Sequence, residues 1–225
     1  MEDVLEVYSR PYSKEYPVIC MDEKPVQLLS NVREELPVRP GDTAKQDNEY
    51  ERNGTCSIFL FTEPLDSWRF AKARERRTKK DWAEEIEWLV EKKYPCAKKI
   101  VLVMDNLNTH TISSLYERFS PEKAFRLAQK LEIHYTPKHG SWLNIAEIEL
   151  SALGSQCLGD RRIDNIEFLN NELSAWMVAR NKKQKGVDWQ FTSEDARIKL
   201  KRLYPVIEED ESDADENAKQ LSLFL

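Results

Sequence analysis

The sequence lacks several features that would assign its class directly. No apolar run approaches the roughly 20 residues that a membrane-spanning helix needs, and the acidic first residues do not have the layout of a signal peptide. The chain has only six glycines and no glycine-rich phosphate loop. Its three histidines are too few for a histidine-rich metal site, and its four cysteines form no CxxC pair. We therefore expect a cytoplasmic protein in a reducing compartment, without structural zinc.

Negative charge is in excess over the 225 residues, and the net charge of −6 at first opposes binding to nucleic acid. The excess is concentrated at one end. Residues 208–225 hold seven acids and one lysine and so carry −6, which leaves a sum of zero for residues 1–207. A neutral body with local basic clusters can still bind DNA, since the local potential matters more than the total. We expect one domain over residues 1–205 and an acidic, disordered tail over 206–225.

Local patterns predict an α/β chain with alternating strands and helices. Residues 1–16 are expected to be irregular, and the polar segment 30–50, which contains prolines and a glycine, is expected to be an extended loop. Short apolar runs predict strands at 17–21, 55–62, 68–74, 99–104 and 132–136. Amphipathic periods and capping residues predict helices at 78–93, 121–131, 143–157, 164–181 and 192–203. The first three strands favour an antiparallel meander, and the later ones favour parallel pairing.

Three acidic residues stand at the boundaries of these predicted elements. Asp22 follows the run 17–21, Asp105 follows the run 99–104, and Glu147 lies near the start of a predicted helix. A charge at the end of a buried strand is costly unless it is paired or bound to a metal ion. Hard divalent cations prefer carboxylate oxygens, so these residues predict a site for Mg²⁺, with Mn²⁺ as a substitute. Two ions about 4 Å apart, bridged by Asp22, would suit phosphodiester cleavage.

The order of the elements resembles the ribonuclease H-like fold, a mixed five-stranded sheet flanked by helices. At the level of motifs, three segments resemble the catalytic domain of transposases of the IS630/Tc1/mariner superfamily, closest to its bacterial IS630 branch. These segments are VICMDEK, IVLVMDNLNTH and TPKHGSWLNIAEIE, and the resemblance covers roughly residues 5–205. It implies that Asp22, Asp105 and Glu147 form a DDE triad. The 41 residues between Asp105 and Glu147 exceed the usual spacing, and the stretch 113–123 is expected to absorb the excess as loop and helix.

The resemblance also implies an activity and its partners. Transposases of this superfamily cleave DNA strands and transfer the freed ends, so the expected partner is double-stranded DNA, as transposon ends and target, in a nucleoid-associated setting. Full-length relatives carry an N-terminal helix-turn-helix region that this chain does not show. We therefore expect weak, non-specific DNA affinity, and either a homodimer or a complex with a helix-turn-helix transposase product.

Two glutamates compete for the third position of the triad. Glu147 and Glu149 would lie about 200° apart on a helix, so only one of them can face the metal ions. Asn144 precedes Glu147 by three residues and would share its face, which favours Glu147. Asn144 would then orient a metal ligand or contact DNA.

Other polar residues near the triad could have either a functional or a purely structural role. Asn106, His110 and His139 could support the metal ligands or the substrate, or could be ordinary loop residues. Glu23 is expected to point away from Asp22 and to be a salt-bridge partner or a support of the metal ligands. Basic residues are candidates for DNA phosphate contacts or for a solvated surface: Arg74, Arg76, Arg77, Lys79, Lys80, Lys138, Arg161, Arg162, Lys182 and Lys183.

Three alternatives to a transposase remain open on the sequence. The first is another nuclease of this fold, such as a ribonuclease H or a junction nuclease. The second is a truncated, non-catalytic or regulatory transposase product without its DNA-reading domain. The third is a receiver-like domain whose aspartate accepts a phosphate, which the apparent hairpin over 55–74 and the late Glu147 disfavour.

Overall fold

The computed structural model describes residues 1–33, 40–41, 48–183 and 186–204. Most of the predicted loop at 30–50 and all of the predicted acidic tail lie outside these residues. The chain divides into two compact units, Met1–Gln190 and Phe191–Leu225. The first unit therefore ends before the predicted domain boundary at 205, and the last predicted helix belongs to the second unit.

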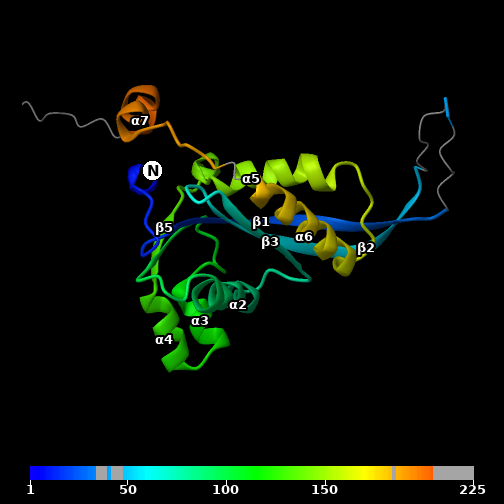
Figure 1. Cartoon of the computed structure of the whole chain (residues 1–225), viewed down its shortest axis with the longest axis horizontal. Helices are drawn as coiled ribbons and strands as arrows, with labels where there is room; N and C mark the ends of the chain where they lie inside the picture. The colour runs from blue at the N-terminus through cyan, green and yellow to red at the C-terminus, as the bar shows by residue number, and fades with distance from the viewer. Residues whose placement is uncertain (34–39, 42–47, 184–185, 205–225) are drawn as a thin grey trace, which may run out of the picture. The chain divides into compact units, whose positions relative to one another are not determined.

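The first unit is built on a five-stranded sheet with the strand order β3-β2-β1-β4-β5 (Figure 1). The strands are β1 (Val18–Asn31), β2 (Tyr50–Glu63), β3 (Trp68–Arg74), β4 (Ile100–Met104) and β5 (Leu131–Tyr135). β1, β2 and β3 pair antiparallel, whereas β4 pairs parallel with both β1 and β5. This arrangement confirms the predicted mixed five-stranded sheet.

Helices cover the sheet, and several begin at the predicted capping residues. They are α1 (Glu2–Ser9), α2 (Lys79–Trp88), α3 (Ile112–Arg118), α4 (Pro121–Gln129), α5 (Ala146–Leu153) and α6 (Ile166–Lys182), with α7 (Ser193–Lys199) in the second unit. Thr78 and Asp81 form a capping box at α2, and Ser120 caps α4 ahead of a proline at its first position. Both α2 and α5 continue into short π-helical turns, Leu89–Lys93 and Gly154–Leu158.

The main core lies between the sheet and the helices α2, α3 and α4, which Figure 1 places below the strands, with α5 above them. Its sheet side is formed by alternate residues of the strands, such as Ile19, Met21, Phe59 and Phe61. Trp82 of α2 packs on this face and is completely buried. Alternation along β1 therefore sends Asp22 to the opposite face, towards α5.

Three expectations about local structure are wrong. β1 does not end before Asp22 but continues to Asn31, because its polar second half pairs antiparallel with β2 from Asp22↔Leu60 to Asn31↔Tyr50. Residues 1–16 are not irregular throughout, since α1 buries Val4 and Val7. The segment between the predicted strand 99–104 and the predicted helix 121–131 is not a loop throughout, because α3 covers Ile112–Arg118.

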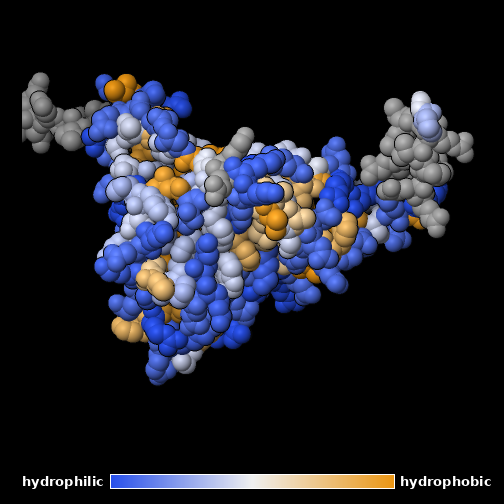
Figure 2. Space-filling model, in the orientation of Figure 1, coloured by the Kyte–Doolittle hydropathy of each residue, from blue (hydrophilic) through white to orange (hydrophobic). Residues whose placement is uncertain are grey.

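The described part of the chain contains no helix long and apolar enough to cross a membrane. The face shown in Figure 2 is largely hydrophilic, with apolar residues in separate patches.

β3 is an edge strand whose outer hydrogen-bonding groups are satisfied by side chains of α6. Asn170 accepts from the Ala73 N–H at 2.8 Å and donates to the Ala73 carbonyl at 3.1 Å. Asn181 does the same for Arg69, at 3.0 and 2.9 Å. The two amides thus replace the backbone of a missing neighbouring strand, which blocks edge-to-edge association.

Asn170→Ala is expected to destabilise the protein by about 1–3 kcal/mol, because it leaves the buried backbone groups of Ala73 without partners. Chemical denaturation measures this loss as a drop in the free energy of unfolding. Asn171→Ala is the matched control, since Asn171 is exposed on the same helix. Equal stability of the two variants would contradict the proposed role of the amide.

Candidate active site

Asp22 lies inside β1 on the face that α5 covers. Its Oδ1 accepts from the Glu23 N–H at 2.7 Å. The Asn144 side-chain amide donates to the Met21 carbonyl at 2.8 Å and approaches Asp22 Oδ2 at 3.3 Å. Asn144 is buried and immediately precedes the turn into α5, so these contacts fix the start of that helix beside Asp22.

The Asp22 carboxyl group lies in a negative environment. Burial raises its pKa, the Glu23 N–H opposes the rise, and the charges of Glu147 and Asp105 raise it further, to about 7. His110 lowers it slightly. The charges of Glu147 and Asp105 are thus close enough to Asp22 to change its pKa. The three acids come from the interior of β1, the end of β4 and the first turn of α5.

Asp105 directly follows β4, and the parallel register of β4 with β1 places it beside Asp22. Its Oδ1 lies 2.5 Å from Nδ1 of His110, a residue that is 1% exposed. This hydrogen bond lowers the pKa of Asp105, while burial opposes the change. Burial lowers the pKa of His110, but Asp105 and Glu23 outweigh it and raise that pKa to about 9. The imidazole is therefore protonated and donates from both nitrogens at neutral pH.

Glu147 lies in the first turn of α5, where its backbone N–H donates to the Asn144 carbonyl at 3.0 Å. Its side chain is exposed, in contrast to Glu149, which is 1% exposed. Glu149 accepts hydrogen bonds from Arg69 at 3.0 Å and from Arg180 at 2.7 Å. The carboxylate of Glu149 is thus paired with two arginines. Of the two competing glutamates, Glu147 is the one whose charge acts on Asp22.

The expected tight convergence of the three carboxylates is not observed. Among the residues that the structure describes, no three His, Cys, Asp or Glu side chains are close enough together to hold a metal ion. The Asp105 carboxylate is instead held by His110, whose Nδ1 lies 2.5 Å from Asp105 Oδ1. The donor set itself still fits a hard divalent cation, since it is all oxygen and its charges require a counterion.

Two of the other predicted residues lie at the surface. Asn106, in the loop after β4, is exposed, and so is His139, in the turn before Gly140. His110 and Asn144 are instead buried and contact the acids directly. A supporting role therefore has a structural basis for His110 and Asn144, and stays a prediction for Asn106 and His139.

The structure reduces the set of basic residues available to DNA. Arg74 is 17% exposed and pairs with Asp81, Glu84 and Glu85, so these carboxylates already offset its charge, and its DNA-binding role stays a prediction. Three further candidates have internal partners: Lys79 with Glu117, Arg161 with Glu172, and Arg162 with Asn31 and the Glu49 carbonyl. Arg77 lies 3.9 Å from Glu23. Arg77 and Arg161 are themselves exposed, and the other exposed candidates are Arg76, Lys80, Lys138, Lys182 and Lys183.

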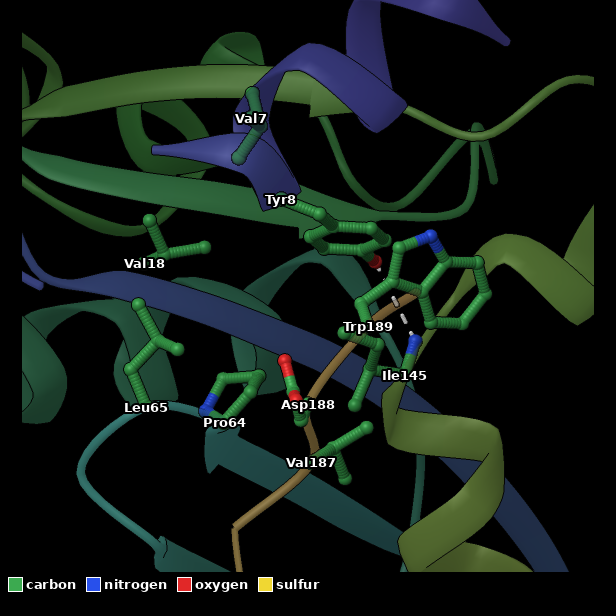
Figure 3. A pocket seen from close by; sticks show the side chains of 9 residues that line it. All are labelled: Val7, Tyr8, Val18, Pro64, Leu65, Ile145, Val187, Asp188 and Trp189. Carbon is green, nitrogen blue, oxygen red and sulfur yellow. Dashed lines mark hydrogen bonds between the residues drawn. The ribbon is translucent and has the colours of Figure 1, made fainter. Parts of the chain in front are cut away.

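Sequence reasoning missed the contribution of α1. The Tyr8 hydroxyl donates to the Leu143 carbonyl at 2.7 Å, and the Tyr8 hydroxyl oxygen accepts from the Ile145 N–H at 3.4 Å. Figure 3 shows the Tyr8 ring beside Trp189, with Ile145 opposite, in a small, mostly apolar pocket. These contacts brace the segment that carries Asn144. The amphipathic spacing of Val4, Val7 and Tyr8 is the signal that could have revealed this helix.

Comparisons with known proteins identify the family and the fold of the chain. A family model described as DDE superfamily endonuclease matches residues 17–170. No curated protein matches the chain in sequence. The fold is that of the catalytic domain of Mos1 mariner transposase, with a TM-score of 0.53, 14% identity and 80% of each chain covered.

The Mos1 mariner paired end complex with Mn gives a TM-score of 0.54 at 17% identity, and the match covers 81% of this chain and 54% of that one. A Mos1 strand transfer complex gives 0.53 at 17% identity, with 78% and 51% covered. This chain therefore spans about half the length of the transposase in these complexes. Its fold is ribonuclease H-like. The chain belongs to the DDE superfamily endonuclease family.

Proposed function

We propose that this chain is the catalytic domain of a DNA transposase, closest to the IS630 branch, which cleaves DNA strands and transfers their ends. Asp22, Asp105 and Glu147 are its metal ligands and catalytic residues. The family model supports endonuclease chemistry, and the fold is shared with a transposase that has been crystallised with Mn and with Mg.

One observation carries this proposal. Asn144 bonds both to the Met21 backbone and to Asp22, and thereby fixes the start of α5 at the strand that carries Asp22. Glu147 follows within one turn, and β4 delivers Asp105 from the other side of β1. Three acids separated by 82 and 41 residues in sequence thus come into one neighbourhood, in which Glu147 and Asp105 both raise the pKa of Asp22.

Two Mg²⁺ ions, with Mn²⁺ as a substitute, would stabilise the attacking and the leaving oxygen of a phosphodiester. Asp22 would hold both ions because it lies between the other two acids, and Asp105 and Glu147 would each hold one. The protein's own contribution is to orient these carboxylates. Asn144 positions Asp22, and the hydrogen bond from His110 positions Asp105.

Double-stranded DNA, as transposon ends and as target, is the proposed substrate. Arg76, Lys80, Lys138, Lys182 and Lys183 are exposed cations proposed to contact its phosphates. Recognition of a terminal sequence is proposed to require a helix-turn-helix region, supplied in a homodimer or by a second transposase product.

The purified chain is expected to nick or join duplex DNA in the presence of Mg²⁺ or Mn²⁺, and to lose this activity completely in excess EDTA. Parallel assays on an RNA–DNA hybrid and on a four-way DNA junction identify the nuclease class. Preference for the hybrid or the junction would contradict a transposase. Absence of cleavage on every substrate, even with a supplied helix-turn-helix protein, would favour a regulatory product.

A further inference from the structure

We propose that Glu23 is a positioning residue of this active site, acting on Asp105 through His110. The proposal rests on the proposed function, because it concerns the orientation of a metal ligand. Glu23 itself contacts neither the substrate nor a metal ion in this scheme.

Glu23 and Asp22 are neighbours on β1 and point to opposite faces of the sheet. Glu23 lies on the face of Met21 and Phe59, where α2 packs, and its side chain is only 4% exposed. A carboxylate so deeply buried beside a hydrophobic core is costly unless a partner compensates its charge. The expected salt-bridge role of Glu23 is thereby explained, and its partner is His110.

His110 joins the two faces. Its Nε2 lies 3.0 Å from Glu23 Oε1, and its Nδ1 lies 2.5 Å from Asp105 Oδ1. The imidazole is rigid, so fixing one nitrogen fixes the direction in which the other donates. Glu23 therefore determines where His110 presents its Nδ1–H, and hence where the Asp105 carboxylate is held.

Other contacts, in addition to these two hydrogen bonds, also restrain His110. Its backbone N–H donates to the Leu107 carbonyl at 2.9 Å, and its carbonyl accepts from the Tyr135 hydroxyl at 2.8 Å. The indole of Trp82 lies 6.0 Å from the imidazole, measured between ring centroids. The loop between β4 and α3 is thus tied to β5 through Tyr135, and the bond to Glu23 restrains the orientation of the imidazole ring.

The second carboxylate oxygen of Glu23, Oε2, lies near a further charged group, Arg77. Oε2 is buried without a hydrogen-bond partner, and Arg77, whose side chain is 51% exposed, places its Nη1 3.9 Å from this oxygen. Two carboxylates share one imidazole, so an additional positive charge offsets their excess. We assign Arg77 to this role rather than to a primary DNA contact.

The test compares two substitutions that keep the size of the side chain. Glu23→Gln keeps Oε1 as an acceptor for His110, whereas Glu23→Met fills the same space with no acceptor. The readout is the Mn²⁺ dissociation constant of the full chain, measured by electron paramagnetic resonance of free Mn²⁺. Glu23→Met is expected to weaken Mn²⁺ binding by about ten- to a hundredfold, as is usual for outer partners of metal ligands. Glu23→Gln is expected to restore most of the affinity.

A second readout separates positioning from a purely structural role. The Mg²⁺ concentration for half-maximal nicking should rise in Glu23→Met, while the rate at saturating Mg²⁺ recovers towards that of the original protein. Circular dichroism and thermal unfolding verify the fold of both variants, and Glu75→Gln, an exposed site, is the control. A merely structural role would lower stability and leave the metal affinity of the folded protein unchanged.

Two results would overturn the inference. One is a Mn²⁺ dissociation constant of Glu23→Met within twofold of that of the original protein, in an experiment in which Asp105→Asn no longer binds Mn²⁺. The other is an equal loss in Glu23→Gln and Glu23→Met, because the bond to His110 would then be irrelevant. Failure of the unaltered chain to bind Mn²⁺ and to cleave DNA would instead refute the proposed function.

Discussion

Asp22→Asn is expected to reduce DNA nicking by about a thousandfold or more, which corresponds to roughly 4 kcal/mol of activation free energy. Asparagine keeps the shape of the side chain but removes the charge that would hold both metal ions. The measurement is the single-turnover rate of nicking of a duplex substrate in Mg²⁺ and in Mn²⁺. Asp105→Asn and Glu147→Gln are expected to give similar losses, since the three acids act as one unit.

The fold of the Asp22→Asn variant should survive. The charge that it removes is partly buried and is repelled by Asp105 and Glu147, so its loss does not lower the free energy of unfolding. Asp160→Asn, at an exposed position, is the matched control and should keep full activity. Unchanged nicking by both Asp22→Asn and Asp105→Asn would remove the catalytic assignment.

Glu149→Ala is expected to destabilise the protein by about 3–5 kcal/mol, because it leaves the Arg69 guanidinium buried without its carboxylate partner. Arg69 and Glu149 are both 1% exposed, and Arg180 joins them from α6. The loss would be a large fraction of the total stability of a typical domain, which is about 5–15 kcal/mol. Equilibrium denaturation in urea measures it.

A surface ion pair of the same type provides the control for this experiment. Glu172 pairs with Arg161, which is 45% exposed, so Glu172→Ala should leave the free energy of unfolding nearly unchanged. A cost for Glu149→Ala no greater than that for Glu172→Ala would show that the buried cluster does not hold α5 and α6 to β3. The comparison separates burial from the mere presence of an ion pair.

Much of the fold was predictable because its causes are local. Apolar runs with turn signals located all five strands, and the capping box of Thr78 with Asp81 located the start of α2. The order of these elements indicated the mixed sheet before any contact was known. The acids Asp22, Asp105 and Glu147 were also identifiable from the sequence, since each stands in a recognisable segment next to such an element.

The extent of β1 was not predictable in the same way. Its second half is polar and resembles a loop, and it is a strand only because β2 pairs with it up to Asn31. The interior position of Asp22 follows from that pairing. Helix α1 was missed for a similar reason, since its short apolar stripe becomes informative only when Tyr8 meets Leu143, far away in the sequence.

Residue types and local periodicity thus indicated the α/β class and the three acids proposed for the site, with the divalent-metal chemistry that carboxylates favour. Which charges are available depended on contacts between distant segments. Arg74 forms ion pairs with three carboxylates, and Glu149 forms ion pairs with two arginines. Glu23 contacts His110, which also contacts Asp105. Hydrophobic periodicity depends on residues that are neighbours in the sequence. The partner of a buried charge depends on which distant segments pack together, because burying a charge without a partner costs too much free energy.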